Sequence, residues 1–599
     1  MKIRNCVVAS LYVLPLITSA VYAQDQNRGG NQRNNETSRM SNTQRSGYLG
    51  RLSESVILAG NLDALQSTAD LDDFYDDIES VKERVQFWHT VAIDTVALDH
   101  TADPDIEDYS PSQGGPTRTS RALAMVQIAV FDALNHFEQE YQSYTPALEG
   151  FENASEHTAI AYAAYNTLVA LYPQQAARLA ELLAEDVSRI ASFTDEDPQA
   201  QGQTLGTSIS EAILLARAED GSNHNEPNFG EGGEVADGTS TYYGTDVNGG
   251  SRLTGEWTPD PNTPDFSGDY NLSLGAYWGK LRPFFLESGD QFRVPAPPEF
   301  DSEEYAEAYA ITASVGGSLE NTFTPSTSTD DTRFIANYWG YDGVPLIGVP
   351  PRVYNQILSQ IASAELDDAV DLARVLALVN VGMADAAIAA WDSKYYYNFW
   401  RPVTGIRADD GAVATVTDED WDPIGVSVVN TEEAIRATPP FPAYPSGHAT
   451  FGAVTFEVLR EMFGDNTAFT FVSDEYNGEG VDPFFPNIPR AFVPVRFSTL
   501  SDAQEQNGVS RIYNGVHWEF DDTAGQELGV QIGQYLLEDT IAFSSNNQND
   551  GRDGGGNDGR DGGGNDGRDG GGNDGRDGGG NDGRDGGGND GRNGGGNGG

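Results

Sequence analysis

The sequence predicts an all-α protein, built from helical bundles that are joined by long irregular connections. Long stretches with apolar residues at helical spacing recur between residues 81 and 537. Ala and Leu fill these stretches, while Gly and Pro lie at their edges, where they favour the ends of helices. The longest connection, residues 219–300, is rich in Gly, Asn, Asp and Pro, which favour turns and loops.

The first 23 residues predict a secretory signal peptide. Lys2 and Arg4 precede an apolar run over residues 6–20, and Val-Tyr-Ala at 21–23 is typical of a cleavage site. Residues 24–78 begin with a stretch rich in Gln, Asn, Arg, Ser and Gly, which predicts a disordered linker. We therefore expect a secreted protein, extracellular or periplasmic. The single cysteine, Cys6, would leave with the signal peptide, so the mature chain would have no disulfide and no cysteine metal ligand.

The charge of the chain excludes some classes of partner. Asp and Glu number 92 against 35 Lys and Arg, which gives a net charge of −57. Such a chain is a poor ligand for nucleic acid or for an anionic membrane surface. Beyond the signal peptide no stretch approaches 18 apolar residues, so we expect no transmembrane segment. A cluster of cations in this chain would therefore stand out.

We expect two helical units, residues 79–300 and 301–545. The first contains predicted helices at 81–98, 120–137, 157–171 and 174–190, and ends near residue 218 before the excursion over 219–300. The excursion has many aromatic residues, so we expect it to pack over the helices rather than to be free. The second unit contains predicted helices at 302–313, 331–339, 352–364, 366–400, 449–463 and 516–537.

The C-terminal tail, residues 546–599, is a low-complexity repeat. From Asn549 the sequence Asn-Asp-Gly-Arg-Asp-Gly-Gly-Gly recurs six times with a period of eight, imperfectly in the last copy. A calcium-binding β-roll needs a period of nine with an apolar position in each repeat, and the tail has neither. The composition favours a disordered, hydrated spacer.

The proline-rich stretch Pro-Pro-Phe-Pro-Ala-Tyr-Pro-Ser-Gly-His, residues 439–448, leads directly into an apolar helical pattern. Proline cannot continue a helix, so Ser446, Gly447 and His448 are predicted to lie where a stiff loop becomes a helix N-terminus. Free N–H groups and the helix dipole favour an oxyanion there, and Gly447 has no side chain to block its approach. Without its surroundings, the stretch could also be a proline-rich loop with a hydroxyl N-cap.

Three cations accompany this stretch. Lys394 and Arg401 are seven residues apart in the predicted helix 366–400, so we expect both on one face, with the helix ending before Pro402. Taken alone, they could be solvated surface cations, but many aromatic residues surround them. The third cation, Arg511, precedes the last predicted helix.

Two histidines complete the predicted site. If His517 begins the last helix, Asp521 at i+4 lies on the same face and could orient its ring. His448 ends the proline-rich stretch. Lys-x6-Arg-Pro, Pro-Ser-Gly-His and Ser-Arg-x5-His-x3-Asp together predict a pocket for a tetrahedral oxyanion.

These three motifs resemble those of the vanadium-dependent haloperoxidases and their relatives, the type 2 phosphatidic-acid phosphatases and bacterial class A acid phosphatases. The likeness is closer to the fungal vanadium chloroperoxidase and covers most of residues 338–525, about a third of the chain. One departure is the 61 residues between His448 and Ser510, somewhat more than in the family. We therefore expect residues 464–509 to be an insertion at the rim of the pocket.

The resemblance implies that the cofactor is vanadate rather than haem, and it assigns roles to the site. His517 would bind vanadium, His448 would be the acid–base residue, and Lys394 would also polarise hydrogen peroxide. Vanadate would act as a Lewis acid without a change of oxidation state. The residues that would hold its oxygens are Lys394, Arg401, Ser446, the backbone N–H of Gly447, and Arg511. Asp342 matches an acidic residue that pairs with the pocket arginines.

Two functions remain open under this resemblance. A haloperoxidase would use hydrogen peroxide to oxidise halide ions, bromide and also chloride, and the product would halogenate organic acceptors. An acid phosphatase would use His517 as the phosphoryl nucleophile and be inhibited by vanadate. Trp391 and Phe441 match apolar halide-pocket positions of chloroperoxidase, which favours the haloperoxidase. A non-catalytic matrix protein is the third possibility, and the intact set of pocket residues argues against it. The oligomeric state is left open.

Overall fold

The computed structural model describes residues 78, 80–102, 106, 109–229, 254–262, 272–412, 414–426, 437–478, 491–538 and 543–545. The predicted signal peptide and repeat tail lie outside these residues, as does the predicted linker except for Ile78. By its contacts the chain divides into Met1–Asn547 and Gln548–Gly599, and no residue of the second unit is described. The described part contains thirteen α-helices and one two-stranded sheet, which confirms the predicted all-α class.

The helices predicted before residue 200 are present. They are α3 (Val81–Asp99), α4 (Gly115–Glu138), α5 (Glu156–Leu171) and α6 (Ala176–Ile190). Ser80 and Glu83 form a capping box at the start of α3, which fixes that boundary. A further helix, α7 (Glu196–Ala216), was not predicted as a separate element. It packs closely on α5 through two glycines, since a Cβ at Gly206 would lie 2.3 Å from the Ala159 carbonyl oxygen.

The second half of the chain contributes the remaining helices. They are α8 (Glu303–Val315), α9 (Asp330–Tyr338), α10 (Pro350–Glu365), α11 (Ala369–Tyr397), α12 (Pro402–Arg407), α13 (Gly447–Phe463), α14 (Leu500–Tyr513) and α15 (Glu519–Glu538). Strands β1 (Phe469–Asn477) and β2 (Phe492–Phe497) pair antiparallel, with Phe469 opposite Phe497.

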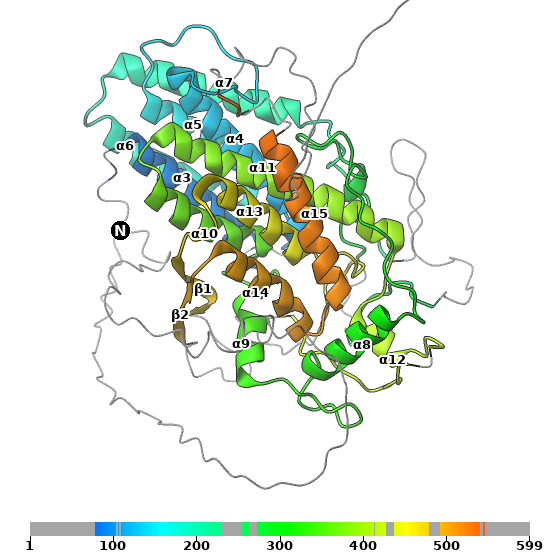
Figure 1. Ribbon diagram of the computed structural model, residues 1–599. Helices are drawn as coiled ribbons and strands as arrows, with labels where there is room; N and C mark the ends of the chain where they lie inside the picture. The colour runs from blue at the N-terminus through cyan, green and yellow to red at the C-terminus, as the bar shows by residue number, and fades with distance from the viewer. Residues whose placement is uncertain are drawn as a thin grey trace, which may run out of the picture. The chain divides into compact units, whose positions relative to one another are not determined.

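Helix α11 is the element around which the site is organised. It packs against α4 on one side and against α13 and α15 on the other (Figure 1). Among the described residues it is the one helix long and apolar enough to cross a membrane, yet 94% of its most apolar window is buried inside the protein. Burial of this kind is expected of a core helix. The division into two helical units near residue 300 stays a prediction.

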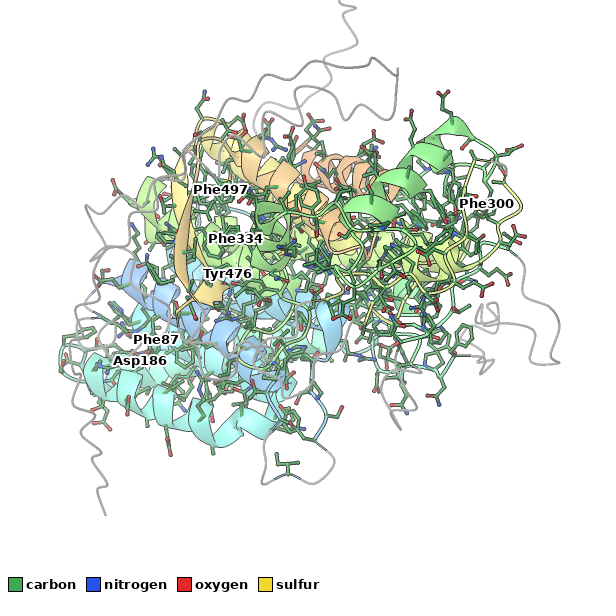
Figure 2. All side chains as sticks on the ribbon, turned by 90° about the horizontal axis from the view of Figure 1, so that it is seen from below. Phe87, Asp186, Phe300, Phe334, Tyr476 and Phe497 are labelled. Atoms are coloured by element: carbon green, nitrogen blue, oxygen red, sulfur yellow. The ribbon has the colours of Figure 1, made fainter. Side chains whose placement is uncertain are left out.

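The described part of segment 464–509 is not a loop at the rim of the site. It contains the two strands and the beginning of α14, an element that we did not predict. Phe334 of α9 contacts Tyr476 of β1 with 4.6 Å between ring centroids, and Phe497 of β2 lies nearby (Figure 2). None of the described residues of this segment lines the cavity described below. The expectation of a rim insertion is therefore wrong for this part, because Phe471, Tyr476 and Phe497 pack against α9.

The described parts of the 219–300 excursion pack on the helices, as predicted. Trp257 and Trp278 are buried, and the Trp257 N–H donates to the Asn398 carbonyl just after α11 (2.8 Å). The amide nitrogens of Phe284, Phe285 and Leu286 all donate to the Asp385 carboxylate on α11 (2.6–3.0 Å). This connection is held by α11 because one buried carboxylate satisfies three of its backbone donors.

Candidate active site

The first part of the site is the N-terminus of α13, which lies where the proline-rich stretch predicted it. Ser446 is the N-cap, and its hydroxyl accepts from the Ala449 N–H (3.4 Å). Gly447 and His448 form the first turn. A Cβ at Gly447 would lie 3.2 Å from the Trp391 ring, a tight contact that only glycine avoids. The turn therefore presents backbone N–H groups close to an aromatic wall.

Lys394 and Arg401 do not lie on one helical face, so that prediction is wrong. Helix α11 ends at Tyr397, and Asn398 turns the chain with a left-handed φ of 50°. Arg401 is the N-cap of α12, and Pro402 begins that helix instead of ending one. A residue before proline is disfavoured in the helical region, which explains why the helix could not run through Arg401.

The two cations nevertheless converge on the proline-rich stretch. Lys394 Nζ donates to the carbonyl oxygens of Pro442 (2.9 Å) and Ala443 (2.8 Å). Arg401 Nε donates to the Phe441 carbonyl (3.0 Å). The loop thus satisfies part of the hydrogen bonding of both cations and fixes their positions against its own backbone.

His517 is held in a defined tautomer. Its Nδ1 lies 2.7 Å from Asp521 Oδ2, and the same oxygen accepts from the Trp518 N–H (3.0 Å). A carboxylate beside Nδ1 favours the proton on that nitrogen, so Nε2 carries the lone pair. Nε2 lies 2.9 Å from Arg401 Nη1. Helix α15 begins at Glu519 rather than at His517, but the ring still reaches Asp521.

Arg511 and His448 both contact the loop between α9 and α10. Arg511, in the last turn of α14, donates through both Nη atoms to Asp342 (2.6 and 3.2 Å). His448 Nε2 lies 2.8 Å from the Gly340 carbonyl oxygen, which can only accept. The His448 proton therefore sits on Nε2, and Nδ1 is the ring nitrogen left for proton exchange.

The site has more positive charge and more donors than its own residues satisfy. Lys394, Arg401 and Arg511 have no exposed surface, and two of their donor atoms, Arg401 Nη2 and Arg511 Nε, are buried without a hydrogen-bond partner among the described residues. Burial first, and then the Arg401 charge, lowers the pKa of Lys394 well below its usual value. An oxyanion would satisfy these donors and stabilise the charges, so the residues present fit a tetrahedral anion such as phosphate or vanadate.

The two histidines also respond to this charge. Burial, followed by the nearby arginines, lowers the pKa of both His448 and His517 well below 6.5. Both rings are therefore neutral near pH 7 in the anion-free protein, which leaves a lone pair on each. In the described part of the chain no group of three His, Cys, Asp or Glu side chains comes together as a metal-ion site.

A cavity of about 1020 Å³ opens onto the site. Gly447, His448, Arg511 and His517 line it together with Trp391 and Phe441, whose rings are 4.9 Å apart. Lys394 Nζ lies 5.1 Å from the centroid of the Phe441 ring, within the range of a cation–π contact. Lys394, Arg401 and Ser446 do not line the cavity, although both cations contact the Phe441 ring.

Two residues that support this wall were missed by sequence reasoning. Trp391 Nε1 donates to the Leu274 carbonyl (3.0 Å), and Gly275 lies so close that a Cβ would be 2.2 Å from the indole. Gly275 has a φ of 76°, a value that favours glycine. No spacing rule could find them, because they lie more than 100 residues before Trp391 in an irregular segment.

Comparisons with known proteins agree with the fold. The family model of the VCPO (vanadium chloroperoxidase) second helical-bundle domain matches residues 374–545. Vanadium chloroperoxidase from Curvularia inaequalis is 29% identical over 532 residues, with 77% of this chain and 82% of that protein covered. The solved structure of a bacterial vanadium-dependent iodoperoxidase has a TM-score of 0.57 at 22% identity, with 77% of this chain and 98% of that chain covered.

The fold is a helical bundle, and residues 374–545 are similar to the second helical-bundle domain of vanadium chloroperoxidase. The predicted resemblance to the vanadium-dependent haloperoxidases is confirmed. The matched domain begins within α11 and contains every predicted pocket residue except Asp342, which lies before it.

We expect an oxyanion to be bound together with protons. Burial lowers the pKa of Lys394 well below its usual value in the anion-free site, and a bound anion would raise it, so protons are taken up on binding and affinity rises as pH falls through the Lys394 pKa of the complex. Calorimetry of phosphate binding across a series of alkaline pH values, in buffers that differ in ionisation enthalpy, measures this uptake. Lys394→Met should remove most of it. Equal uptake by wild type and variant would contradict the assignment to Lys394.

Proposed function

We propose that this protein is a vanadium-dependent haloperoxidase, which uses hydrogen peroxide to oxidise bromide and chloride to hypohalous acids. One observation carries the proposal: the His517 Nε2 lone pair lies among three buried cations, and two of them, Arg401 and Arg511, each have a buried donor atom without a partner among the described residues. The similarity to the Curvularia enzyme supports vanadate as the cofactor. When bound, vanadate supplies a Lewis acid that activates hydrogen peroxide without changing its own oxidation state.

One residue of the site would bind vanadium, and the others would hold the oxygens of the anion. His517 Nε2 would hold vanadium, since Asp521 keeps the proton on the other nitrogen. Arg401 Nη2 and Arg511 Nε, the two unpartnered donors, would hold oxygens of the anion together with Ser446 and the Gly447 N–H. Asp342 keeps the Arg511 guanidinium in place through two hydrogen bonds.

Lys394 and His448 would act on the peroxide. An ammonium has three donors, and Lys394 uses two on the Pro442 and Ala443 carbonyls, so one remains to polarise the oxidant. His448 Nδ1 is the nitrogen that can take up and return the proton that moves when peroxide is bound and used. Burial keeps the dielectric constant low and strengthens both effects.

The apolar wall formed by Trp391 and Phe441 supports oxidation of chloride as well as bromide. Chloride is harder to oxidise, so it needs a strongly polarised oxidant and little competing water. The Phe441 ring lies 5.1 Å from Lys394 Nζ and 5.0 Å from Arg401 Cζ, where it excludes water from both cations.

We expect Phe441→His to reduce chlorination more than bromination. The substitution places a polar, titratable ring beside the cations. Water can then enter, which raises the local dielectric constant and weakens the electrostatic polarisation of the oxidant by Lys394. The measurement is the ratio of chlorination to bromination rates between about pH 4 and 7, the range in which histidine titrates. Phe441→Leu, which keeps an apolar side chain, serves as the control. An unchanged ratio in Phe441→His, or an equal loss in both variants, would contradict this role.

An acid phosphatase is the rival function, because the same pocket holds phosphate and His517 Nε2 could attack phosphorus. The deciding experiment loads the purified protein with vanadate and assays peroxide-dependent bromination beside hydrolysis of a phosphate ester. We expect bromination that requires vanadate and is lost with excess phosphate, since both anions compete for one cationic pocket. Ester hydrolysis by the vanadate-free protein without any bromination would overturn the proposal.

We also propose that the protein is secreted, on the basis of its N-terminal 23 residues. Organic halogen acceptors would then be encountered outside the cytoplasm. N-terminal sequencing of the protein from the culture medium is the test, and a secreted chain beginning at Gln24 is the expected result. Retention of the intact chain inside the cell would refute it.

A further inference from the structure

The loop formed by residues 340–343 contacts the oxyanion site at two points. The Gly340 carbonyl oxygen accepts from His448 Nε2 (2.8 Å), and Asp342 accepts from both Nη atoms of Arg511. His448 and Arg511 line the cavity. The shape of this loop therefore sets the orientation of the proton-transfer ring and of one of the three cations.

Tyr341, between these two contacts, has a positive φ of 46°, a conformation that is unfavourable for a residue with a side chain. Groups outside the site hold it there. Its N–H donates to Glu475 Oε1 (3.0 Å), and its hydroxyl donates to Gln356 Oε1 (2.7 Å) and accepts from the Asp474 N–H (2.9 Å). Asp474 and Glu475 lie on β1, and Gln356 lies on α10.

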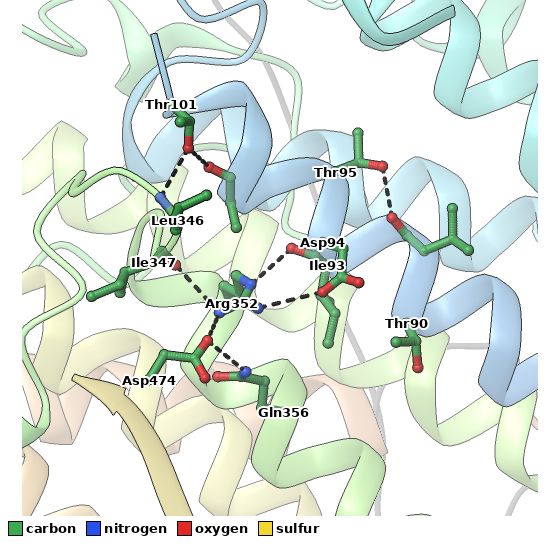
Figure 3. A network of polar contacts seen from close by, with 12 residues as sticks. Thr90, Ile93, Asp94, Thr95, Thr101, Leu346, Ile347, Arg352, Gln356 and Asp474 are labelled. Carbon is green, nitrogen blue, oxygen red and sulfur yellow. Dashed lines mark hydrogen bonds and ion pairs between the residues drawn. The ribbon is translucent and has the colours of Figure 1, made fainter. Parts of the chain in front are cut away.

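Arg352 contacts one of these partners, Asp474, which in turn accepts from Gln356 (Figure 3). Its buried guanidinium pairs with Asp474 and, at 3.4 Å, with Asp94 of α3. It also donates to the carbonyl oxygens of Ile93 (2.9 Å) and Ile347 (3.5 Å). One side chain thus joins α3, the segment before α10, and β1.

Gln356 connects the Asp474 carboxylate to the Tyr341 hydroxyl. Gln356 Nε2 donates to Asp474 Oδ2 (3.0 Å), while Gln356 Oε1 accepts from the Tyr341 hydroxyl. Neither Arg352, Asp474 nor Gln356 lines the cavity, so none of these residues touches the site directly.

We propose that Arg352, Asp474 and Tyr341 are positioning residues that clamp the loop 340–343, and thereby fix the tautomer of His448 and the place of Arg511. The roles of His448 and Arg511 in this proposal rest on the function proposed above. Removing one partner of a buried ion pair leaves the other charge buried and uncompensated. We expect the loop 340–343 to move so that water can reach that charge. Substitution of residues that orient the groups in direct contact with a ligand typically lowers affinity or activity by about 10–100-fold.

The test uses the anion-free protein and inorganic phosphate as the probe. Tyr341→Phe removes the hydroxyl bridge with little change in shape, and Arg352→Met removes the ion pairs. Nitrogen-15 NMR of labelled histidine reports which ring nitrogen of His448 carries the proton, with the signal assigned through His448→Gln. Calorimetry gives the affinity for phosphate.

The matched control is Arg84→Met. Arg84 of α3 pairs with Asp186 of α6, with 2.8 Å between Arg84 Nη2 and Asp186 Oδ1. Both side chains have no exposed surface, and neither lines the cavity. Loss of this pair should lower the unfolding temperature yet leave His448 and phosphate affinity as in wild type. It thus separates a loss of stability from a displaced loop.

We expect Tyr341→Phe to weaken phosphate binding by about tenfold and to give His448 a mixture of tautomers. Arg352→Met, where it folds, should do the same more strongly. Wild-type phosphate affinity and a single Nε2–H tautomer in Tyr341→Phe would overturn the proposal, as would the same changes in Arg84→Met. A protein that never brominates would still give these readouts, so failure of the proposed function is distinguishable from failure of the clamp.

Discussion

Replacing His517 by alanine is expected to reduce vanadate-dependent bromination by on the order of 10³-fold or more, as for other groups used directly in the chemistry. The reason is geometric. Nδ1 contacts Asp521 at 2.7 Å, so the lone pair is on Nε2, which lies 2.9 Å from Arg401 Nη1 within the cluster of cations. Activity is measured after loading with vanadate, and retained vanadium is measured by elemental analysis after dialysis.

The His517→Ala variant should lose vanadium on dialysis, because only charge and hydrogen bonds would still hold the anion. Asp521→Ala should give a smaller loss, about 10–100-fold, since it frees the ring without removing it. His89→Ala is a matched control: His89 is equally buried, contacts the Asn355 carbonyl, and does not line the cavity. Bromination by His517→Ala at a rate close to that of His89→Ala would show that His517 does not anchor the cofactor.

Replacing His448 by alanine is expected to lower the turnover number by about 10²–10⁴-fold, the usual contribution of a general acid–base group. Vanadate affinity should change much less, because the three cations and His517 stay in place. His448 keeps its proton on Nε2 through the Gly340 carbonyl, so its other nitrogen is the one that exchanges protons. Steady-state kinetics together with vanadate titration separate the two quantities.

His448→Gln distinguishes proton transfer from positioning. A glutamine can still donate to the Gly340 carbonyl, yet it cannot carry a proton to or from a substrate. We expect it to turn over as slowly as His448→Ala while its vanadate affinity equals that of wild type. A glutamine variant with near-normal turnover would mean that the contact to Gly340, not proton transfer, is the contribution of this residue. Equal vanadate dissociation constants for His517→Ala and His448→Ala would contradict the division of roles.

Much of the fold could be predicted from the sequence, and the predicted site residues lie close together in the structure, although their roles stay predictions. Apolar periodicity located most helices, and four prolines followed by Ser446, Gly447 and His448 located the beginning of α13 to within two residues. These signals are local: a cap, a proline or a repeat of apolar positions acts within a few residues of itself. Helices α7, α12 and α14 were missed. The interiors of α7 and α14 hold Gly, Gln, Asn and Ser, whose packing depends on the partner helix.

What the sequence by itself determined is therefore the chemistry: which cations, histidines and hydroxyl are available, and that an oxyanion suits them. The tertiary structure decided how they meet. Lys394 and Arg401 approach each other through the carbonyls of residues 441–443, not along a helix, and Trp391 is held by the Leu274 backbone from 117 residues away. Such contacts depend on chain segments that fold against one another, and a local pattern holds no information on which distant carbonyl a buried donor will find.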